Sequence, residues 1–270
     1  DWILRRAVTE RLAPVLYAVF RALPTPVPIL DRLRTSWVSA RRQYLLGVEQ
    51  LSGVLSALER EGVAAIPLKG PTLAEALYPD PGLRPFTDLD LLIHKADLSR
   101  VLQLLPALGY RHLDDGRSLE YAQAYGNAAC FVGEGPPPAD FPLDVHWKLL
   151  DYRSGRRAAA IDLQEIWDRA VKVQGWSQPA LGLCPEDLLI YLALHWAVHH
   201  ALSGLVWPLD LALLLRRQGA QLDWDGVAER AQRWRVAGAL YFALCEIHDQ
   251  FGVGVPPALL ARFWPAGRQA

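Results

Sequence analysis

The chain has 270 residues, of which 51% are hydrophobic, so it is long enough to bury a substantial core. Its 28 basic and 29 acidic side chains nearly cancel, which argues against a surface built to wrap a nucleic-acid polymer. No apolar segment reaches the roughly 18 residues that a membrane-spanning helix needs, so no membrane association is expected.

The first sixty residues carry apolar positions at helical spacing. They predict one helix over 2–22, ended by the prolines that begin at Pro24, and a second helix capped by Asp31. The second helix is expected to run to about Glu61, where Gly62 ends it.

The middle third holds short apolar runs bounded by glycine and proline, which is the pattern of buried strands. Strands are expected at 63–68, 87–93, 110–113, 127–133 and 141–148, helices at 71–78 and 96–105, and a turn at 133–138. From residue 161 the helical spacing returns and stays. Helices are expected there at 161–171, 186–203, 208–218, 223–236, 238–251 and 257–264.

Strands in the middle and helices at both ends predict an α+β fold. The expected division is an N-terminal helical segment at 1–62, a mixed-sheet core at 63–150 and a C-terminal helical region at 151–270. The three cysteines lie far apart and form neither a disulfide framework nor a Cys-x-x-Cys pair. Because the N-terminal residues also lack the pattern of a signal peptide, we expect a reducing, cytoplasmic location.

Two aspartates alternate with apolar residues in the segment 87–93. Alternate side chains of a strand share a face, so Asp88 and Asp90 point the same way. The alternate apolar residues Leu89, Leu91 and Ile93 then face the core. Two neighbouring carboxylates repel each other unless a proton or a cation lies between them. A pair of Mg²⁺ ions bridged by acidic oxygens relieves this repulsion, and a solvated strand edge is the alternative.

The segment 141–147 alternates in the same way and places Asp144 and His146 on one face. A carboxylate in the centre of an apolar strand is costly to bury without a partner. Asp144 therefore meets either a cation in the interior or water at the edge of the sheet.

A glycine turn joins the first expected strand to a helix, in the order Lys69-Gly70-Pro71. Glycine lets a phosphate approach the backbone, a helix N-terminus offers N–H groups to an anion, and Lys69 adds a positive charge. The alternative is an ordinary strand-to-helix turn with a lysine on the surface. Neither a Walker A loop nor a Gly-x-Gly-x-x-Gly motif is present.

The order of these features resembles the DNA polymerase β-like nucleotidyltransferase superfamily, and within it an uncharacterised nucleotidyltransferase family with a Lys-Gly signature. The resemblance spans residues 45–260. It rests on Leu68-Lys69-Gly70, Leu77-Tyr78-Pro79, Leu83-Arg84-Pro85, Asp88-Leu89-Asp90-Leu91-Leu92, Leu108-Gly109-Tyr110, Asp144-Val145-His146-Trp147, His195, His199, Trp207, Asp210-Leu211-Ala212 and Asp223-Trp224.

The resemblance implies a nucleotidyltransferase core in which Asp88 and Asp90 bind two Mg²⁺ or Mn²⁺ ions and Asp144 binds the catalytic one. It implies transfer of a nucleoside monophosphate from a nucleoside triphosphate (NTP) to a hydroxyl-bearing small molecule, peptide or protein. Asp144 is also placed to accept the proton of that hydroxyl.

The glycine turn departs from the superfamily, which usually has Gly-Gly or Gly-Ser where this chain has Gly70-Pro71. Proline has no N–H to donate to a phosphate. The resemblance therefore implies that Lys69, Thr72 and Arg84 hold the triphosphate together with Gly70.

Further polar residues are candidates for the acceptor pocket. His195 and His199 stand one helical turn apart in the C-terminal region, and their alternative is to pack within it. Asp210 opens an apolar helical run, where its alternative is a charge stabilised by the helix dipole. With His146, these residues form the predicted acceptor pocket.

Two other functions stay open from the sequence. The same metal centre would serve transfer from another phosphorylated donor, such as a nucleotide sugar in natural-product tailoring. A non-catalytic module that binds a nucleotide or peptide is the third hypothesis. Metal binding separates the module from the enzymes, and release of pyrophosphate separates the two enzymes.

Overall fold

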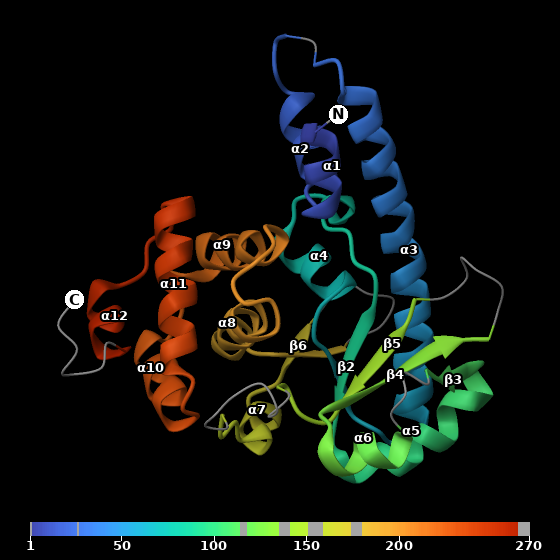
Figure 1. Cartoon of the computed structure of the whole chain (residues 1–270). Helices are drawn as coiled ribbons and strands as arrows, with labels where there is room; N and C mark the ends of the chain where they lie inside the picture. The colour runs from blue at the N-terminus through green and yellow to red at the C-terminus, as the bar shows by residue number, and fades with distance from the viewer. Residues whose placement is uncertain are drawn as a thin grey trace. The chain divides into compact units, whose positions relative to one another are not determined.

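The computed structural model describes residues 2–25, 27–113, 118–134, 141–150, 159–173 and 180–263. The chain forms two compact units (Figure 1). The first comprises Asp1–Leu149 and Val171–Gly182, and the second comprises Leu150–Ala170 and Leu183–Ala270. The three-part division expected from the sequence stays a prediction.

The first unit contains a five-stranded sheet with the strand order β1-β2-β5-β4-β3. Its strands are β1 (Ala65–Pro67), β2 (Leu89–Ile93), β3 (Tyr110–His112), β4 (Ala128–Gly133) and β5 (Leu143–His146). Neighbouring strands are antiparallel except β2 and β5, which are parallel. The sheet is therefore mixed, and each of its strands lies within one of the strands expected from the sequence.

Alternation along the strands decides which residues form the core. Leu89 and Leu91 of β2 and Val145 of β5 are at most 1% exposed and pack with Leu51 and other residues of a long helix. All five residues of β2 are buried, as expected of a central strand covered on both faces. Polar residues at the other positions of β2 and β5 therefore lie on the face opposite this core.

The first unit also contains helices. They are α1 (Trp2–Thr9), α2 (Ala13–Phe20), α3 (Leu30–Arg60), α4 (Pro71–Leu77), α5 (Leu98–Leu104) and α6 (Leu119–Tyr125), with 3₁₀ turns η1 (Pro81–Leu83), η2 (Lys95–Asp97) and η3 (Leu105–Leu108). Figure 1 shows α3 running along the sheet, with α1 and α2 beside its N-terminal half. A two-stranded antiparallel sheet of β6 (Val171–Val173) and β7 (Ala180–Gly182) adjoins β1.

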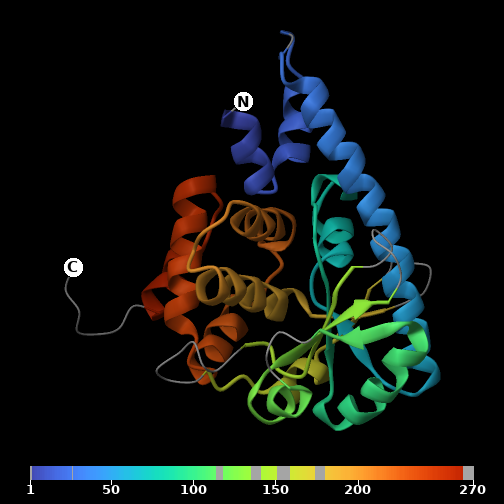
Figure 2. The ribbon, with the colours of Figure 1, turned by 45° about the vertical axis from the view of Figure 1, so that its right-hand side comes forward.

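The second unit is helical in its described residues. Its elements are α7 (Leu163–Asp168), α8 (Pro185–Leu194), the π-helix η5 (His195–His199), α9 (Val206–Gln218), α10 (Trp224–Arg233), α11 (Ala237–Phe251) and α12 (Pro257–Phe263). Figure 2 shows α8 among its neighbours α9, α10 and α11. No helix among the described residues is long and apolar enough to cross a membrane.

The N-terminal helices differ from the prediction at two points. The helix expected over 2–22 is broken into α1 and α2, because Arg11 has a left-handed φ of 58° and α2 has a proline in its first turn. Asp31 is not the cap of α3: it lies in the first turn, where a carboxylate complements the helix dipole, and Ile29 is the capping residue. The expected end at Gly62 is confirmed, since α3 stops at Arg60 and Gly62 has a φ of 67°.

Three further elements differ from the sequence prediction. The expectation that helix persists from residue 161 is wrong, because β6 and β7 interrupt it. Helix α6 was not predicted, and the helix expected over 186–203 ends as α8 followed by η5. The strand pair falls where tertiary pairing outweighs residue spacing, and the helix over 186–203 falls where the helix type changes locally. Most of the turn expected at 133–138 lies outside the described residues.

Candidate metal and nucleotide site

The pairing of β2 with β5 brings two of the predicted carboxylates together. Asp90 and Asp144 are partners in the parallel register, so their side chains leave the same face of neighbouring strands. His146 is two residues beyond Asp144 and leaves that face as well. Residues that are 54 positions or more apart in the sequence thus meet at the centre of the sheet.

Asp88 lies one residue before β2 and is partly buried. Burial raises the pKa of its carboxyl group, and the negative charges of Asp90 and Asp144 raise it further, while the positive charge of Lys69 opposes them. The three predicted carboxylates therefore act on one another electrostatically. Such repulsion is what a divalent cation relieves.

Asp90 is 3% exposed and has two positively charged or chargeable partners on one oxygen. Its Oδ1 lies 3.1 Å from Nζ of Lys69 and 3.1 Å from Nε2 of His146. Burial by itself raises the pKa of Asp90, but the ammonium of Lys69 and the hydrogen bond from His146 outweigh it and hold the pKa well below its ordinary value. Asp90 is therefore a charged carboxylate in the interior of the protein.

Polar atoms next to this ion pair lack partners. Oδ2 of Asp90 and Nδ1 of His146 are buried and have no hydrogen-bond partner among the described residues. Leaving a buried acceptor without a partner costs about 1–3 kcal/mol, so such atoms mark a place where a ligand is expected. The orphaned carboxylate oxygen is thus independent support for a cation site.

The donor atoms suit a metal ion. Asp90, Asp144 and His146 each offer one ligand atom, and these atoms all lie within 4.8 Å of one another. Carboxylates are the ligands preferred by Mg²⁺ and Mn²⁺, whereas imidazole also accepts softer metals. The residues therefore fit a divalent cation, whose identity the donor set leaves open.

His146 lies in the cluster with Asp90 and Asp144, although the sequence did not predict it as a metal ligand. Its predicted role in the acceptor pocket stays a prediction. The signal for this was present: Asp144 and His146 alternate on one strand face, as Asp88 and Asp90 do. What the sequence lacked was the register that aligns the two strands.

The glycine turn positions Lys69 against Asp90. The N–H of Leu68 donates to the main-chain oxygen of Asp90 at 3.0 Å, which fixes the end of β1 beside β2. Gly70 follows with φ 64° and ψ −126°, a conformation that disfavours any residue with a Cβ. A Cβ there would also lie 3.3 Å from the carbonyl oxygen of Asp88. Glycine is therefore required both by the backbone and by the closeness of the aspartate segment.

The other residues predicted to hold phosphate are less exposed than expected for a surface loop. Oγ1 of Thr72, in the first turn of α4, is buried without a hydrogen-bond partner among the described residues. Arg84 follows η1 and is 2% exposed. Their predicted role in binding the triphosphate stays a prediction.

The remaining predicted residues lie in the second unit. His195 and His199 begin and end the π-helix η5, and their rings stack with centroids 5.4 Å apart. His195 also meets the ring of Trp207 edge-on at 4.9 Å. Asp210 is completely buried and lies beyond the first turn of α9, so it is not a helix-terminal charge. A place for these residues in an acceptor pocket stays a prediction.

A pocket that the sequence did not predict adjoins Asp88. It has a volume of about 410 Å³, within the range of small-molecule sites, and lies between the N-terminal helices and the segment 85–87. Thr35, Ser39 and Gln43 line one side at a spacing of one helical turn. On the other side Arg11 donates to Thr87, the residue before Asp88, at 3.4 Å.

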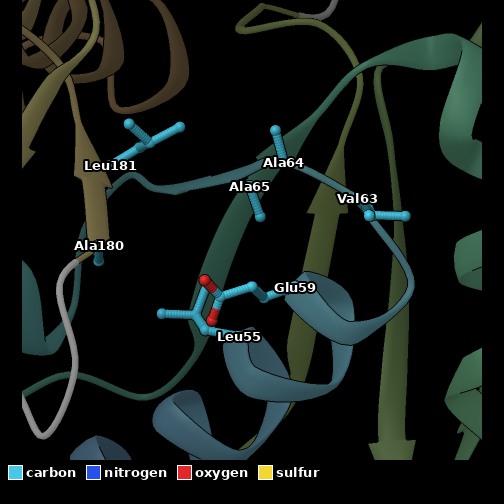
Figure 3. Close-up of a pocket in the computed structure, with 8 residues that line it drawn as sticks. Leu55, Glu59, Val63, Ala64, Ala65, Ala180 and Leu181 are labelled. Carbon is cyan, nitrogen blue, oxygen red and sulfur yellow. The ribbon is translucent and has the colours of Figure 1, made fainter.

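A second pocket lies away from the carboxylates (Figure 3). Its volume is about 270 Å³, and its walls are largely apolar, with Glu59 as the charged residue. It includes Ala65, which pairs with Ile93 at the opposite end of β2 from Asp90. This pocket therefore does not belong to the candidate site.

A family model described as "uncharacterised nucleotidyltransferase" matches residues 1–252. No curated protein sequence matches the chain. Among solved structures, the antibiotic-resistance factor ANT(2'')-Ia is similar with a TM-score of 0.46 and 16% identity, over 75% of this chain and 96% of that one. An antigenic nucleotidyltransferase-like protein from Paracoccidioides brasiliensis is similar with a TM-score of 0.46 and 15% identity, over 79% and 91%.

Proposed function

The chain belongs to the uncharacterised nucleotidyltransferase family, and we propose on that premise that it transfers a nucleoside monophosphate from an NTP to a hydroxyl group, using Mg²⁺ or Mn²⁺. Its family makes it a transferase of nucleotidyl groups. The observation that carries the metal dependence is the buried carboxylate of Asp90, which has an orphaned oxygen beside Asp144.

Asp88, Asp90 and Asp144 would hold the metal ions in this proposal, and the donor atoms of His146 lie within the same cluster. When bound, the ions supply positive charge for the phosphates and lower the pKa of the acceptor hydroxyl. Asp144 is less buried than Asp90, and in the proposal it accepts the hydroxyl proton.

The proposed transfer forms one bond to phosphorus and breaks another. The acceptor oxygen forms a bond to the α-phosphorus while the bond from that phosphorus to the bridging oxygen breaks. Pyrophosphate leaves with the electron pair, and Asp144 holds the proton of the hydroxyl. Lys69, Thr72 and Arg84 are proposed to neutralise or hydrogen-bond the phosphates, and Gly70 to let them approach the backbone.

The acceptor is proposed to be a small molecule, a peptide or a protein rather than a nucleic-acid polymer, because the 28 basic and 29 acidic side chains nearly cancel. His146, His195, His199 and Asp210 are the proposed acceptor-side residues. The cytoplasmic location expected from the sequence likewise stays a prediction.

Calorimetric titration tests the donor site. Non-hydrolysable analogues of ATP, GTP, CTP and UTP are titrated with and without Mg²⁺ into the wild type, Asp88→Asn and Asp249→Asn. Asp249 is an exposed carboxylate on α11, so its variant controls for the loss of one charge. We expect metal-dependent binding of at least one analogue, lost in Asp88→Asn and kept in Asp249→Asn.

Equal binding by Asp88→Asn and the wild type would contradict the assignment of the site. If no triphosphate binds although Mg²⁺ or Mn²⁺ does, NTP is not the donor, and another phosphorylated donor such as a nucleotide sugar takes its place.

A further inference from the structure

We propose that Lys69 is an exchangeable counter-cation of the metal site: its ammonium group holds Asp90 when no metal is bound, and a divalent cation displaces it. The displaced ammonium is then available to the phosphates of the donor. This inference rests on the proposed function for the identity of the cation and the donor. It goes beyond that function in assigning Lys69 two successive partners.

Asp90 needs a cation at all times because of its burial. Its side chain is 3% exposed, and an isolated carboxylate at such a position is strongly disfavoured. The ammonium of Lys69 supplies such a charge, with Nζ 3.1 Å from Oδ1 of Asp90. Lys69 thus supplies the positive charge that a bound metal ion would supply to Asp90.

The ion pair leaves half of the carboxylate unused. Both Lys69 and His146 contact Oδ1, while Oδ2 is buried without a partner among the described residues. A pairing that is optimal for a buried carboxylate would satisfy both oxygens. The carboxylate of Asp90 therefore keeps one oxygen with which it can bind a ligand.

A divalent cation and the ammonium of Lys69 compete for the same carboxylate. The ligand atoms of Asp90, Asp144 and His146 lie within 4.8 Å of one another, so a cation bound among them sits close to Oδ1 as well. Two positive charges at such separation repel strongly in a site with little water. The divalent metal ion has the higher charge and more carboxylate ligands. It therefore displaces the ammonium of Lys69 from Asp90.

Lys69 is built to move while its backbone stays in place. The main chain is held on one side by the hydrogen bond from Leu68 to Asp90 and on the other by the special conformation of Gly70. The ammonium itself is carried on four flexible methylene groups, and the side chain keeps 11% of its surface exposed. Exchange of partners therefore requires a change of rotamer and no change of fold.

The exchange couples metal binding to donor binding. Without a donor, displacement of Lys69 breaks its ion pair with Asp90 and brings no phosphate in return, which weakens the binding of the metal ion. With a triphosphate present, the displaced ammonium gains a phosphate partner, so each ligand strengthens the binding of the other. Bare metal is therefore expected to bind weakly to the wild type.

The test measures metal affinity without nucleotide, by calorimetric titration of Mg²⁺ and Mn²⁺ into the wild type, Lys69→Met, Lys69→Arg and Lys95→Met. Lys95 is an exposed lysine in η2, so Lys95→Met makes the same chemical change away from the site. We expect Lys69→Met to bind metal about tenfold or more tightly than the wild type, because the competing charge is gone. Lys69→Arg and Lys95→Met should stay close to the wild type.

Thermal unfolding gives a second readout of the same variants. Lys69→Met should melt lower than the wild type without metal, since Asp90 has lost its ammonium partner, and should gain more from added Mg²⁺. Metal affinity in Lys69→Met that is equal to or weaker than that of the wild type overturns the exchange. So does an equal tightening in Lys95→Met, or an absence of metal binding in every variant.

Titration of the NTP analogues into the same proteins separates the two proposals. Metal bound more tightly by Lys69→Met, with no triphosphate bound by any variant, supports the exchange and contradicts the proposed function. If Lys69→Met does not fold, Lys69→Gln and Lys69→Arg take its place: tightening in Lys69→Gln but not in Lys69→Arg supports the exchange, and no difference between them overturns it.

Discussion

Each unit buries one aspartate between two basic side chains, and the two arrangements differ in how completely they satisfy it. Asp187 of the second unit accepts hydrogen bonds on both oxygens: Arg169 donates to Oδ2 at 3.0 Å and to Oδ1 at 3.1 Å, and Arg230 donates to Oδ1 at 2.7 Å. Among the residues that the structure describes, Asp90 of the first unit finds partners on Oδ1 alone.

The difference separates a structural ion pair from a ligand site. Planar guanidinium groups match a carboxylate in shape and fix it in place, whereas an ammonium is a point charge on a flexible chain. Asp187 thus links α8 to α10 through Arg230, and both of its carboxylate oxygens have partners. Asp90 is held in its charged form but keeps an oxygen for another partner.

The largest expected effect is on stability in the second unit. Asp187→Asn should lower the free energy of unfolding by about 3–5 kcal/mol, because it leaves the buried guanidinium of Arg230 and the half-buried one of Arg169 facing a neutral side chain. Urea denaturation followed by circular dichroism measures it. Mg²⁺ should not restore this loss, and recovery of stability by Mg²⁺ would erase the distinction between the two aspartates.

A smaller loss is expected for the matching change in the first unit. Asp90→Asn should cost about 2 kcal/mol, since Lys69 loses its carboxylate but its ammonium has a path to solvent. The lowered pKa of Asp90 means that its charged form stabilises the fold above the ordinary pKa of a carboxyl group. The difference between wild type and variant should therefore shrink as acid protonates Asp90, in unfolding curves recorded at successive pH values.

Added metal should stabilise the wild type by somewhat less than the loss expected for Asp90→Asn. A ligand that binds the folded state at ten times its dissociation constant contributes about 1.4 kcal/mol. Thermal unfolding with MgCl₂ or MnCl₂ measures the gain, and EDTA should remove it. The gain should vanish in Asp90→Asn, and a full gain in that variant would place the metal elsewhere.

The smallest expected effect is a gain in stability. Asp88→Asn should stabilise the metal-free protein by about 0.5 kcal/mol at neutral pH, after solvent screening of a partly exposed group, because it removes repulsion from Asp90 and Asp144. The raised pKa of Asp88 makes its charged form unfavourable in the fold, so the gain exists above that pKa and disappears as the pH falls through it. A loss of stability at neutral pH would show that the carboxylates do not repel one another.

Much of the site was predictable because it depends on short-range patterns. The alternation around Asp88, Asp90 and Asp144 follows from the two-residue period of a strand, and the requirement for Gly70 follows from a tight turn before a helix. Helix α6 and the pair β6 and β7 were missed because such short elements carry little periodicity. Elements of the same length, such as α4 and β1, were predicted from the glycines and prolines that bound them in the sequence.

The sequence by itself determined the α+β character, the strands that carry the aspartates and the family resemblance, since each rests on residues close in the chain or on their order. The tertiary structure alone decided that β2 and β5 are parallel neighbours and that Asp90 and Asp144 face each other. It also decided that Lys69 lies on Asp90 and that His146 joins the metal cluster. Strand register and the contacts across it depend on the packing of distant segments, which no local pattern specifies.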